Sequence, residues 1–224
     1  MLPFFFGLVA LAVALFFLIK LKHKDVAEAA AVLGLTPVAK GAQSRGRTAE
    51  GWEFHETVFA EGAIEGVPAQ LLTRMIRGVV MPRASRNVAQ FTVLALGSAA
   101  PRRASLRLQP AGVMRELEAF TKGAPPAIAT GDAAFDEAYR LYAEEPAAAM
   151  LAVTPDLRQA LLALHASAGA GKPGTTVNYL ASSSLLGTFD ITPDRATFYV
   201  YGSPTRSTAE RVKAAAPILV RLAG

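Results

Sequence analysis

The sequence predicts an α+β protein in which a single N-terminal transmembrane helix precedes a soluble domain of antiparallel sheet packed with helices. Three features predict this class. Residues 2–19 contain no charged side chain, residues from Trp52 onward alternate apolar with polar, and Thr154-Pro155-Asp156 opens a segment with an apolar stripe. Alternation with a period of two is typical of strands, and apolar residues three and four apart are typical of helices.

Residues 2–19 are long enough to cross a membrane. As a helix rising about 1.5 Å per residue they extend about 27 Å, close to a hydrocarbon thickness of about 30 Å. The alternative is a cleaved secretory signal, which needs a basic residue before the apolar run, a run of about 7 to 15 residues and a small-residue cleavage site. No Lys or Arg precedes this run, and Ala12 and Ala14 lie inside it. These features favour an uncleaved anchor.

Basic residues follow the predicted span directly. Lys20, Lys22 and Lys24 form this membrane flank, and only Met1 lies on the other side. Because basic flanks stay in the cytoplasm, the soluble domain is expected to be cytoplasmic, in a single-pass protein of a bacterial inner membrane. The absence of Cys excludes disulfides and thiolate metal sites, and it fits either a cytoplasm or a periplasm.

Residues 20–51 are expected to join the span to the domain. Residues 25–33 are rich in Ala and Glu and end at Gly34, which predicts a short helix. Residues 36–51 contain Gly, Pro and Ser without any periodicity. This composition predicts a linker that lets the domain move away from the bilayer.

The soluble domain, residues 52–224, is expected to begin with an antiparallel meander. A hairpin with its turn at Glu61-Gly62 is predicted by an alternating pattern, in which Trp52, Phe54, Glu56 and Val58 alternate with Glu53, His55, Thr57 and Phe59. Because the connections are short, neighbouring strands are expected to be antiparallel. The four strands are expected at residues 52–59, 67–76, 88–96 and 104–109.

A second group of elements begins near Gly112, so residues 52–111 and 112–224 are two candidate lobes. Thr154 is a predicted N-cap, with Pro155 at the first helical position. Residues 135–143 predict a strand, although residues 133–142 also fit a helix. The other expected elements are helical turns at residues 114–120, a short helix at 146–153, strands at 175–182 and 196–201, and a last helix at 208–222 that Pro217 kinks or restarts.

No motif in the chain specifies a cofactor or a metal. Gly171-Lys172 lacks the earlier Gly and the following Ser or Thr of a phosphate-binding loop, and Ser44 lacks the strand and helix of a nucleophile elbow. The histidines His23, His55 and His165 have no second ligand at the spacing of a metal site. We therefore expect no cofactor and no metal.

Asp132 and Asp136 are the acidic pair that could carry chemistry. Two carboxylates four residues apart can act as acid and base, which would make the chain a membrane-anchored hydrolase. A Gly-Asp pair at the start of an element is more often a turn and a cap. Convergence of both carboxylates in a concave pocket would favour the enzyme, and exposed capping positions would favour a scaffold.

Charge is distributed unevenly along a chain of net charge +5. The interval between Glu65 and Glu116 contains no Asp or Glu, whereas residues 116–156 are mainly acidic, so the two intervals are expected to attract each other. The arginines of the first interval are Arg74, Arg77, Arg83, Arg86, Arg102, Arg103, Arg107 and Arg115.

Four of these arginines, Arg83, Arg86, Arg102 and Arg103, lie in predicted loops, where they stay available to a partner. Near an anionic leaflet each would add about 1 kcal/mol of attraction. Nucleic acid is not expected, because the interval lacks interleaved aromatic residues and a recognition helix. We predict a non-enzymatic accessory or scaffold protein that binds a membrane-protein complex or the anionic bilayer surface through this arginine-rich face, with no small-molecule substrate. The layout is similar to that of many bacterial membrane-anchored proteins, and no motif names a family.

Overall fold

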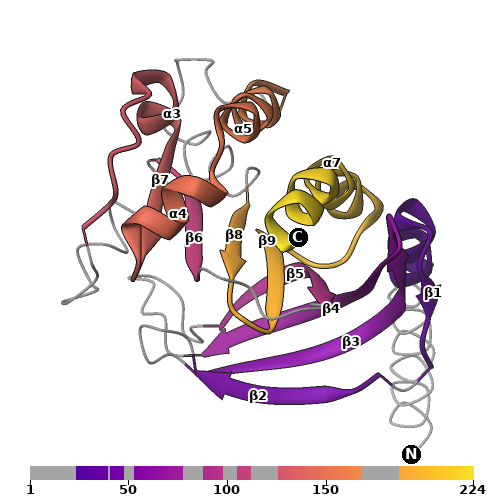
Figure 1. Cartoon of the computed structure of the whole chain (residues 1–224). Helices are drawn as coiled ribbons and strands as arrows, with labels where there is room; N and C mark the ends of the chain where they lie inside the picture. The colour runs from indigo at the N-terminus through magenta and orange to yellow at the C-terminus, as the bar shows by residue number, and fades with distance from the viewer. Residues whose placement is uncertain are drawn as a thin grey trace, which may run out of the picture.

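The computed structural model describes residues 24–39, 41–47, 53–77, 88–97, 105–111, 126–167 and 187–224. They form one antiparallel sheet of nine strands packed with helices (Figure 1). The predicted α+β class is confirmed for this part of the chain, and the predicted span at residues 2–19 lies outside it. Among the described helices, none is by itself long and apolar enough to cross a membrane. By length and composition, α4 (Pro146–Ala152) and α5 (Pro155–Ser167) meet that test only together, as a pair bent by 73°.

The helix at residues 24–33 is docked onto the sheet. Its Ala29 and Ala30 are fully buried in the main core, and Leu35 is buried directly after the helix ends. β1 (Thr36–Pro37) and β2 (Gln43–Arg47) then pair with successive parts of the same edge of β3 (Glu53–Ile64). The predicted helix is confirmed, but the predicted linker over residues 36–51 is wrong in its described part, which forms edge strands.

Two glycines of the predicted linker serve close packing. A Cβ on Gly41 would collide with the carbonyl group of Val58, and a Cβ on Gly46 would lie 2.6 Å from the ring of Phe54. Glycine in a strand often marks such a close approach of another element. The composition that predicted flexibility therefore belongs to a segment that lies tightly against β3.

β3 and β4 (Val67–Arg77) form the predicted hairpin with a different turn. The two-residue turn is Glu65-Gly66, with φ of 51° and 79°. Positive φ at both central residues matches the natural twist of a hairpin. Gly62, expected in the turn, continues the strand, where a Cβ would lie 3.0 Å from the side chain of Leu35.

The strand order departs from a meander after β5 (Val88–Gly97). β5 pairs with β4 as predicted, but its other neighbour is β9 (Arg195–Tyr201), and β8 (Thr188–Ile191) lies between β9 and β6 (Leu106–Pro110). The predicted meander is wrong beyond β5, because alternation encodes which face is buried and not which strand is the neighbour. A single sheet therefore runs through both candidate lobes.

The segment that fits either a helix or a strand contains both. α3 (Ala133–Ala138) leads directly into β7 (Tyr139–Ala143), which pairs with β6. The Thr154 hydroxyl accepts a hydrogen bond from the Leu157 amide at 3.3 Å, which confirms the predicted N-cap of α5. The last helix, α7 (Arg206–Ala223), continues through Pro217 without a restart. The elements predicted at residues 114–120 and 175–182 lie outside the described residues.

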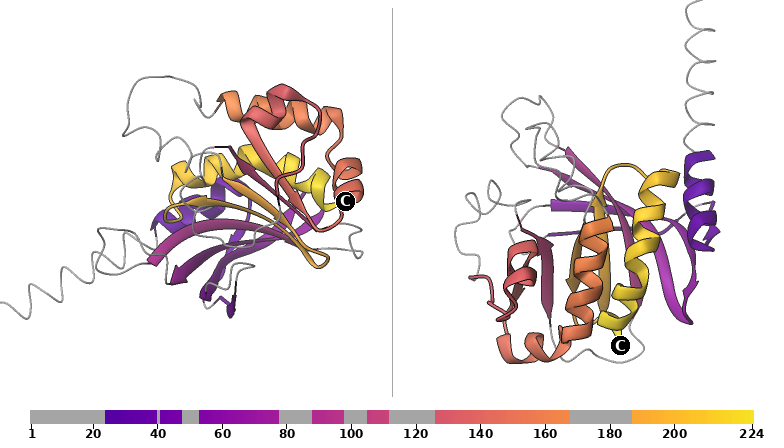
Figure 2. Two further views of the ribbon diagram at one scale, coloured as in Figure 1. Left: turned by 90° about the vertical axis from the view of Figure 1, so that its left-hand side faces the viewer. Right: turned by 90° about the horizontal axis from the view of Figure 1, so that it is seen from above.

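The described helices pack on one face of the sheet (Figure 2). We call it the helix-covered face. Buried residues of the helix at 24–33, α3, α4, α5 and α7 share one apolar cluster with inward side chains of the strands. A second, smaller cluster of Val58, Leu72, Val93 and Ala95 lies on the opposite face, which we call the helix-free face.

Candidate functional site

The four arginines expected to meet a partner, Arg83, Arg86, Arg102 and Arg103, lie outside the described residues, as do Lys20 and Lys22 of the membrane flank. Lys24 begins the docked helix, and its Nζ lies 3.8 Å from the Glu28 carboxylate in an exposed ion pair. An exposed pair of this kind contributes little to stability. Lys24 is therefore an exposed residue at the start of the docked helix.

The attachment points of the two arginine-bearing segments are far apart. Residues 78–87 precede Val88 and residues 98–104 follow Gly97, at opposite ends of β5. A strand of that length extends about 30 Å. The docked helix and β1 lie near the Gly97 end, since Thr36 pairs with Glu61, which is in register with Gln70 and, one strand further, with Ala95 (Figure 1).

Asp132 and Asp136 both bind their own turn. Asp132 Oδ1 accepts a hydrogen bond from the Phe135 amide at 3.2 Å, so Asp132 is the N-cap of α3. The Asp136 carboxylate accepts bonds from the amide of Thr130 at 3.0 and 3.1 Å and from its hydroxyl at 2.8 Å. Gly131, between Thr130 and Asp132, has φ of 78°, which glycine adopts easily. These contacts are those of a turn and a cap.

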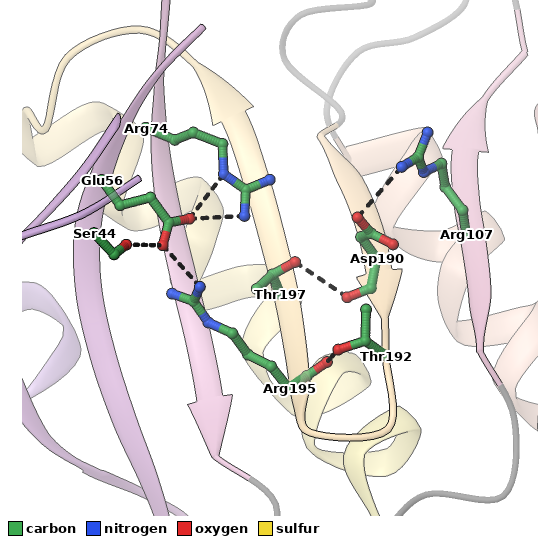
Figure 3. Close-up of polar contacts among 8 residues, drawn as sticks. All are labelled: Ser44, Glu56, Arg74, Arg107, Asp190, Thr192, Arg195 and Thr197. Carbon is green, nitrogen blue, oxygen red and sulfur yellow. Dashed lines mark hydrogen bonds and ion pairs between the residues drawn. The ribbon is translucent and has the colours of Figure 1, made fainter. Parts of the chain in front are cut away.

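The helix-free face carries a buried charged group that the sequence did not single out. Glu56 on β3 accepts a hydrogen bond on Oε1 from Arg74 Nε at 2.8 Å, and Arg74 Nη2 lies 2.8 Å from the same oxygen in an ion pair. Its Oε2 accepts from Arg195 Nη1 at 2.8 Å and from Ser44 Oγ at 3.2 Å (Figure 3). We call these four residues the Glu56 cluster. They bring together β2, β3, β4 and β9.

Glu56 is only 4% exposed, yet it stays ionised. Burial by itself raises the pKa of a carboxyl group, but the hydrogen bonds and charges of Arg195 and Arg74 outweigh burial and hold the pKa of Glu56 below its ordinary value. Four donor atoms also contact the two carboxylate oxygens. Glu56 is therefore suited to holding strands together and not to moving a proton at neutral pH.

Arg74 is clamped between aromatic rings. Its guanidinium carbon lies 4.9 Å from the Phe54 ring centroid and 5.5 Å from that of Tyr199. Phe91 in turn packs edge-on against Tyr199 and Tyr201, with centroids 5.6 and 5.8 Å apart. Cation–π contacts of a desolvated arginine add to its ion pair. Contacts with Glu56, Phe54 and Tyr199 thus hold the guanidinium of Arg74 in place.

Glu56 and Arg195 are not neighbours in the sheet. β4 and β5 lie between their strands, and Ala196 is in register with Gly62, six residues beyond Glu56. In a flat sheet they would be roughly 25 Å apart, at about 4.8 Å per strand and about 3.4 Å per residue. Their 2.8 Å contact requires the sheet to twist and coil until the two positions meet over the helix-free face.

A second ion pair lies further along this face. Arg107 Nη2 on β6 is 3.4 Å from Asp190 Oδ2 on β8, and Thr197 Oγ1 donates to the Asp190 carbonyl at 3.1 Å (Figure 3). Arg74 and Arg107 belong to the basic interval, but Glu56 and Asp190 do not belong to the acidic interval at residues 116–156. The expected attraction between the intervals does not account for these two pairs. The one signal for the cluster was Glu56 itself, a charge in an apolar register.

Within the described ranges, no group of three or more His, Asp or Glu side chains could hold a metal ion. His165 on α5 packs edge-on against Tyr139, with ring centroids 5.6 Å apart, and its Nδ1 is buried without a hydrogen-bond partner. Burial lowers the pKa of His165. Its surroundings are those of a neutral side chain at the rim of the core.

No protein family model matches the chain, and no curated protein matches it. Among solved structures, the chain is similar to the crystal structure of the mycobacterial trehalose monomycolate transport factor A, TtfA. The sequence identity is 11% and the TM-score 0.46, over 89% of this chain and 93% of that chain. Both values are too low for the likeness to support an argument about function.

Proposed function

We propose that the protein is a single-pass, membrane-anchored accessory or scaffold protein without enzymatic activity, whose domain lies on the cytoplasmic side of a bacterial inner membrane. The apolar run at residues 2–19 and the lysines that follow it support the anchor and its orientation. The partner is a membrane-protein complex or the anionic bilayer surface itself. The arginines of residues 78–104 supply the attraction.

The docked helix at residues 24–33 is the observation that carries this proposal. Four residues separate the apolar run from the described helix, and they extend at most about 14 Å. Ala29 and Ala30 are fully buried in the domain core, so the helix belongs to the domain and is not a spacer. A domain attached in this way stays against the membrane surface, where a scaffold for a membrane complex needs to be.

The arginines are then expected to act as two unequal pairs. Arg102 and Arg103 follow the Gly97 end of β5, which lies near the docked helix, whereas Arg83 and Arg86 precede the opposite end. A domain held by its docked helix presents the Gly97 end to the leaflet first. Arg102 and Arg103 therefore carry more of the proposed contact.

The hydrolase alternative draws no support from the described contacts of Asp132 and Asp136. Each carboxylate accepts hydrogen bonds from the turn in which it lies, so both have a local structural role. A catalytic pair would instead aim at a shared space. The accessory role is the better supported of the two.

Gentle detergent solubilisation of the full chain, followed by co-purification, tests the proposal. We expect a stoichiometric membrane-protein partner or retained anionic lipid, and we expect the variant with Arg83, Arg86, Arg102 and Arg103 all replaced by Gln to lose it. Arg206→Gln is the matched control, because Arg206 is exposed and pairs with its helix neighbour Glu210. Recovery of the full chain from the soluble fraction would contradict the anchor, and equal recovery of partner by the quadruple variant would contradict the arginine face.

A further inference from the structure

The charges of the Glu56 cluster do not balance. One carboxylate faces two guanidinium groups, from Arg74 and Arg195, which leaves one excess positive charge in a mostly buried site. Among the described residues, neither arginine has a second carboxylate partner. Asp194, next to Arg195 in the chain, is exposed and makes no ion pair with it. Removing an uncompensated charge from water is costly.

The two arginines differ in how many of their nitrogens bind Glu56 and in how exposed their side chains are. Arg74 places two of its nitrogens on Glu56 Oε1, stacks on two rings and is 11% exposed. Arg195 places one nitrogen on Oε2, and its side chain is 31% exposed. A guanidinium has five N–H donors in a planar fork. The open edge of Arg195 is therefore the place where the excess charge meets solvent.

Glu56 also holds this edge in position. Because the carboxylate binds Arg74 and Arg195 at the same time, the two guanidinium groups are fixed beside each other in spite of their mutual repulsion. A preorganised pair of this kind binds oxyanions well, since the fork matches a carboxylate or phosphate with two parallel hydrogen bonds. The coiled sheet thus presents a rigid donor group.

We propose that the Glu56 cluster binds an oxyanion, a phosphate or carboxylate group, on the open edge of Arg195. The anion cancels the excess charge and completes the hydrogen bonds of the guanidinium. Glu56 and Arg74 are positioning residues, and Arg195 is the residue that touches the ligand. The site uses none of the four arginines on which the proposed membrane contact rests.

Thermal unfolding of the full chain in a non-ionic detergent tests the site with inorganic phosphate as the probe. At saturating phosphate we expect the Tm to rise by about 5 °C, because a ligand that binds only the folded chain stabilises it. Sodium chloride at equal ionic strength controls for screening. Arg195→Gln should lose the shift, and Arg206→Gln, which removes an exposed arginine of α7, should keep it.

Arg195→Lys keeps the charge and removes the fork, so it covers the case in which Arg195→Gln does not fold. We expect its affinity for phosphate, measured by titration calorimetry, to fall at least about threefold. Three outcomes would each overturn the proposal. The Tm shift with phosphate could be equal in the wild type and Arg195→Gln, the phosphate affinity could be equal in the wild type and Arg195→Lys, or sodium chloride could reproduce the Tm shift.

Mixed micelles that contain phosphatidylglycerol distinguish the source of the anion. Competition between these micelles and inorganic phosphate would assign a lipid headgroup to the site. Phosphate binding without competition would assign a soluble phosphorylated or carboxylated compound. Absence of binding in both arms would overturn the site, while the membrane contact through residues 78–104 would still be open to its own test.

Discussion

Leu71, Leu94 and Phe198 on the helix-covered face are at most 1% exposed and belong to one apolar cluster, whereas the helix-free face buries Glu56 at 4% exposure among arginines and aromatic rings. The first face is held by the area of apolar surface that it removes from water, and that contribution is insensitive to pH and salt near neutrality. The second depends on compensation of charge, which protons and anions can change. The sheet thus has one face whose stabilisation is insensitive to pH and salt near neutrality and one face whose stabilisation depends on protons and anions.

Removal of the docked helix should give the largest effect on the helix-covered face. A chain that begins at Gly34 loses the buried Ala29, Ala30 and Leu33, which costs about 5 kcal/mol with the adjoining valines. Compared with a chain that begins at Lys24, we expect a Tm lower by more than about 10 °C. Equal melting curves would mean that the helix is an appendage and would remove the support for a closely held domain.

Phe198→Ala tests a single side chain of the same face. Phe198 is 1% exposed and packs on Phe189 with ring centroids 4.6 Å apart, so we expect a loss of about 4 kcal/mol in urea unfolding. Tyr201→Ala is the control on the same strand, since Tyr201 is 52% exposed and its loss should cost under about 1 kcal/mol. Similar losses in the two variants would contradict the assignment of faces.

Glu56→Gln tests the helix-free face and its dependence on pH. At pH 7 the variant leaves two guanidinium groups without a carboxylate, and we expect a loss of about 3 kcal/mol. Because the folded pKa of Glu56 lies below its ordinary value of 4.5, its contribution is complete above that pH and is lost as the pH falls through the folded pKa. The difference between wild type and variant should therefore shrink below about pH 4.5.

Glu210→Gln is the control for this pH dependence. Glu210 is exposed and pairs with Arg206 one helical turn away, so the substitution should change stability little at any pH. If the difference in stability between the wild type and Glu56→Gln stays constant from pH 7 down to pH 3, lost packing, and not lost charge, causes the destabilisation.

Replacement of the loop arginines should have the smallest effect on stability and a clear effect on binding. In a chain that begins at Lys24, Arg102→Gln with Arg103→Gln should lower the affinity for anionic vesicles by up to about 30-fold, at about 1 kcal/mol per arginine. Arg83→Gln with Arg86→Gln should lower it less, because these residues precede the far end of β5. Equal losses from the two pairs would indicate that both segments meet on one surface.

Local signals predicted the local structure. The N-cap Thr154 and Pro155 at the start of α5 marked the helix correctly, because capping depends on neighbours a few residues away. The hairpin was recognised, but its turn was predicted at Glu61-Gly62, whereas the structure has it at Glu65-Gly66, where φ is positive. A glycine in a strand, such as Gly46, and a glycine in a loop have the same appearance in a sequence.

Long-range signals did not predict their partners. Alternation placed Leu94 and Phe198 in strands without showing that β9 lies beside β5, more than 100 residues later in the chain. The Glu56 cluster could not be assembled for the same reason, because Arg195 is 139 residues from Glu56. The sequence shows that Glu56 is a charged residue in an apolar register. It does not show the coiling of the sheet that brings Arg195 to Glu56.

The position of β9 has a consequence for synthesis of the protein. While the ribosome is still making residues 98–194, β5 has β4 on one side and an open backbone edge on the other, which β9 covers only when it emerges. The nascent sheet therefore has an unpaired strand edge until nearly the whole chain has been translated. Pairing of β9 with β5 is a late, non-local step. Pausing or premature termination after β5 would leave this edge free to pair with a second nascent chain, so production of this protein should depend on chaperones more strongly than its size implies.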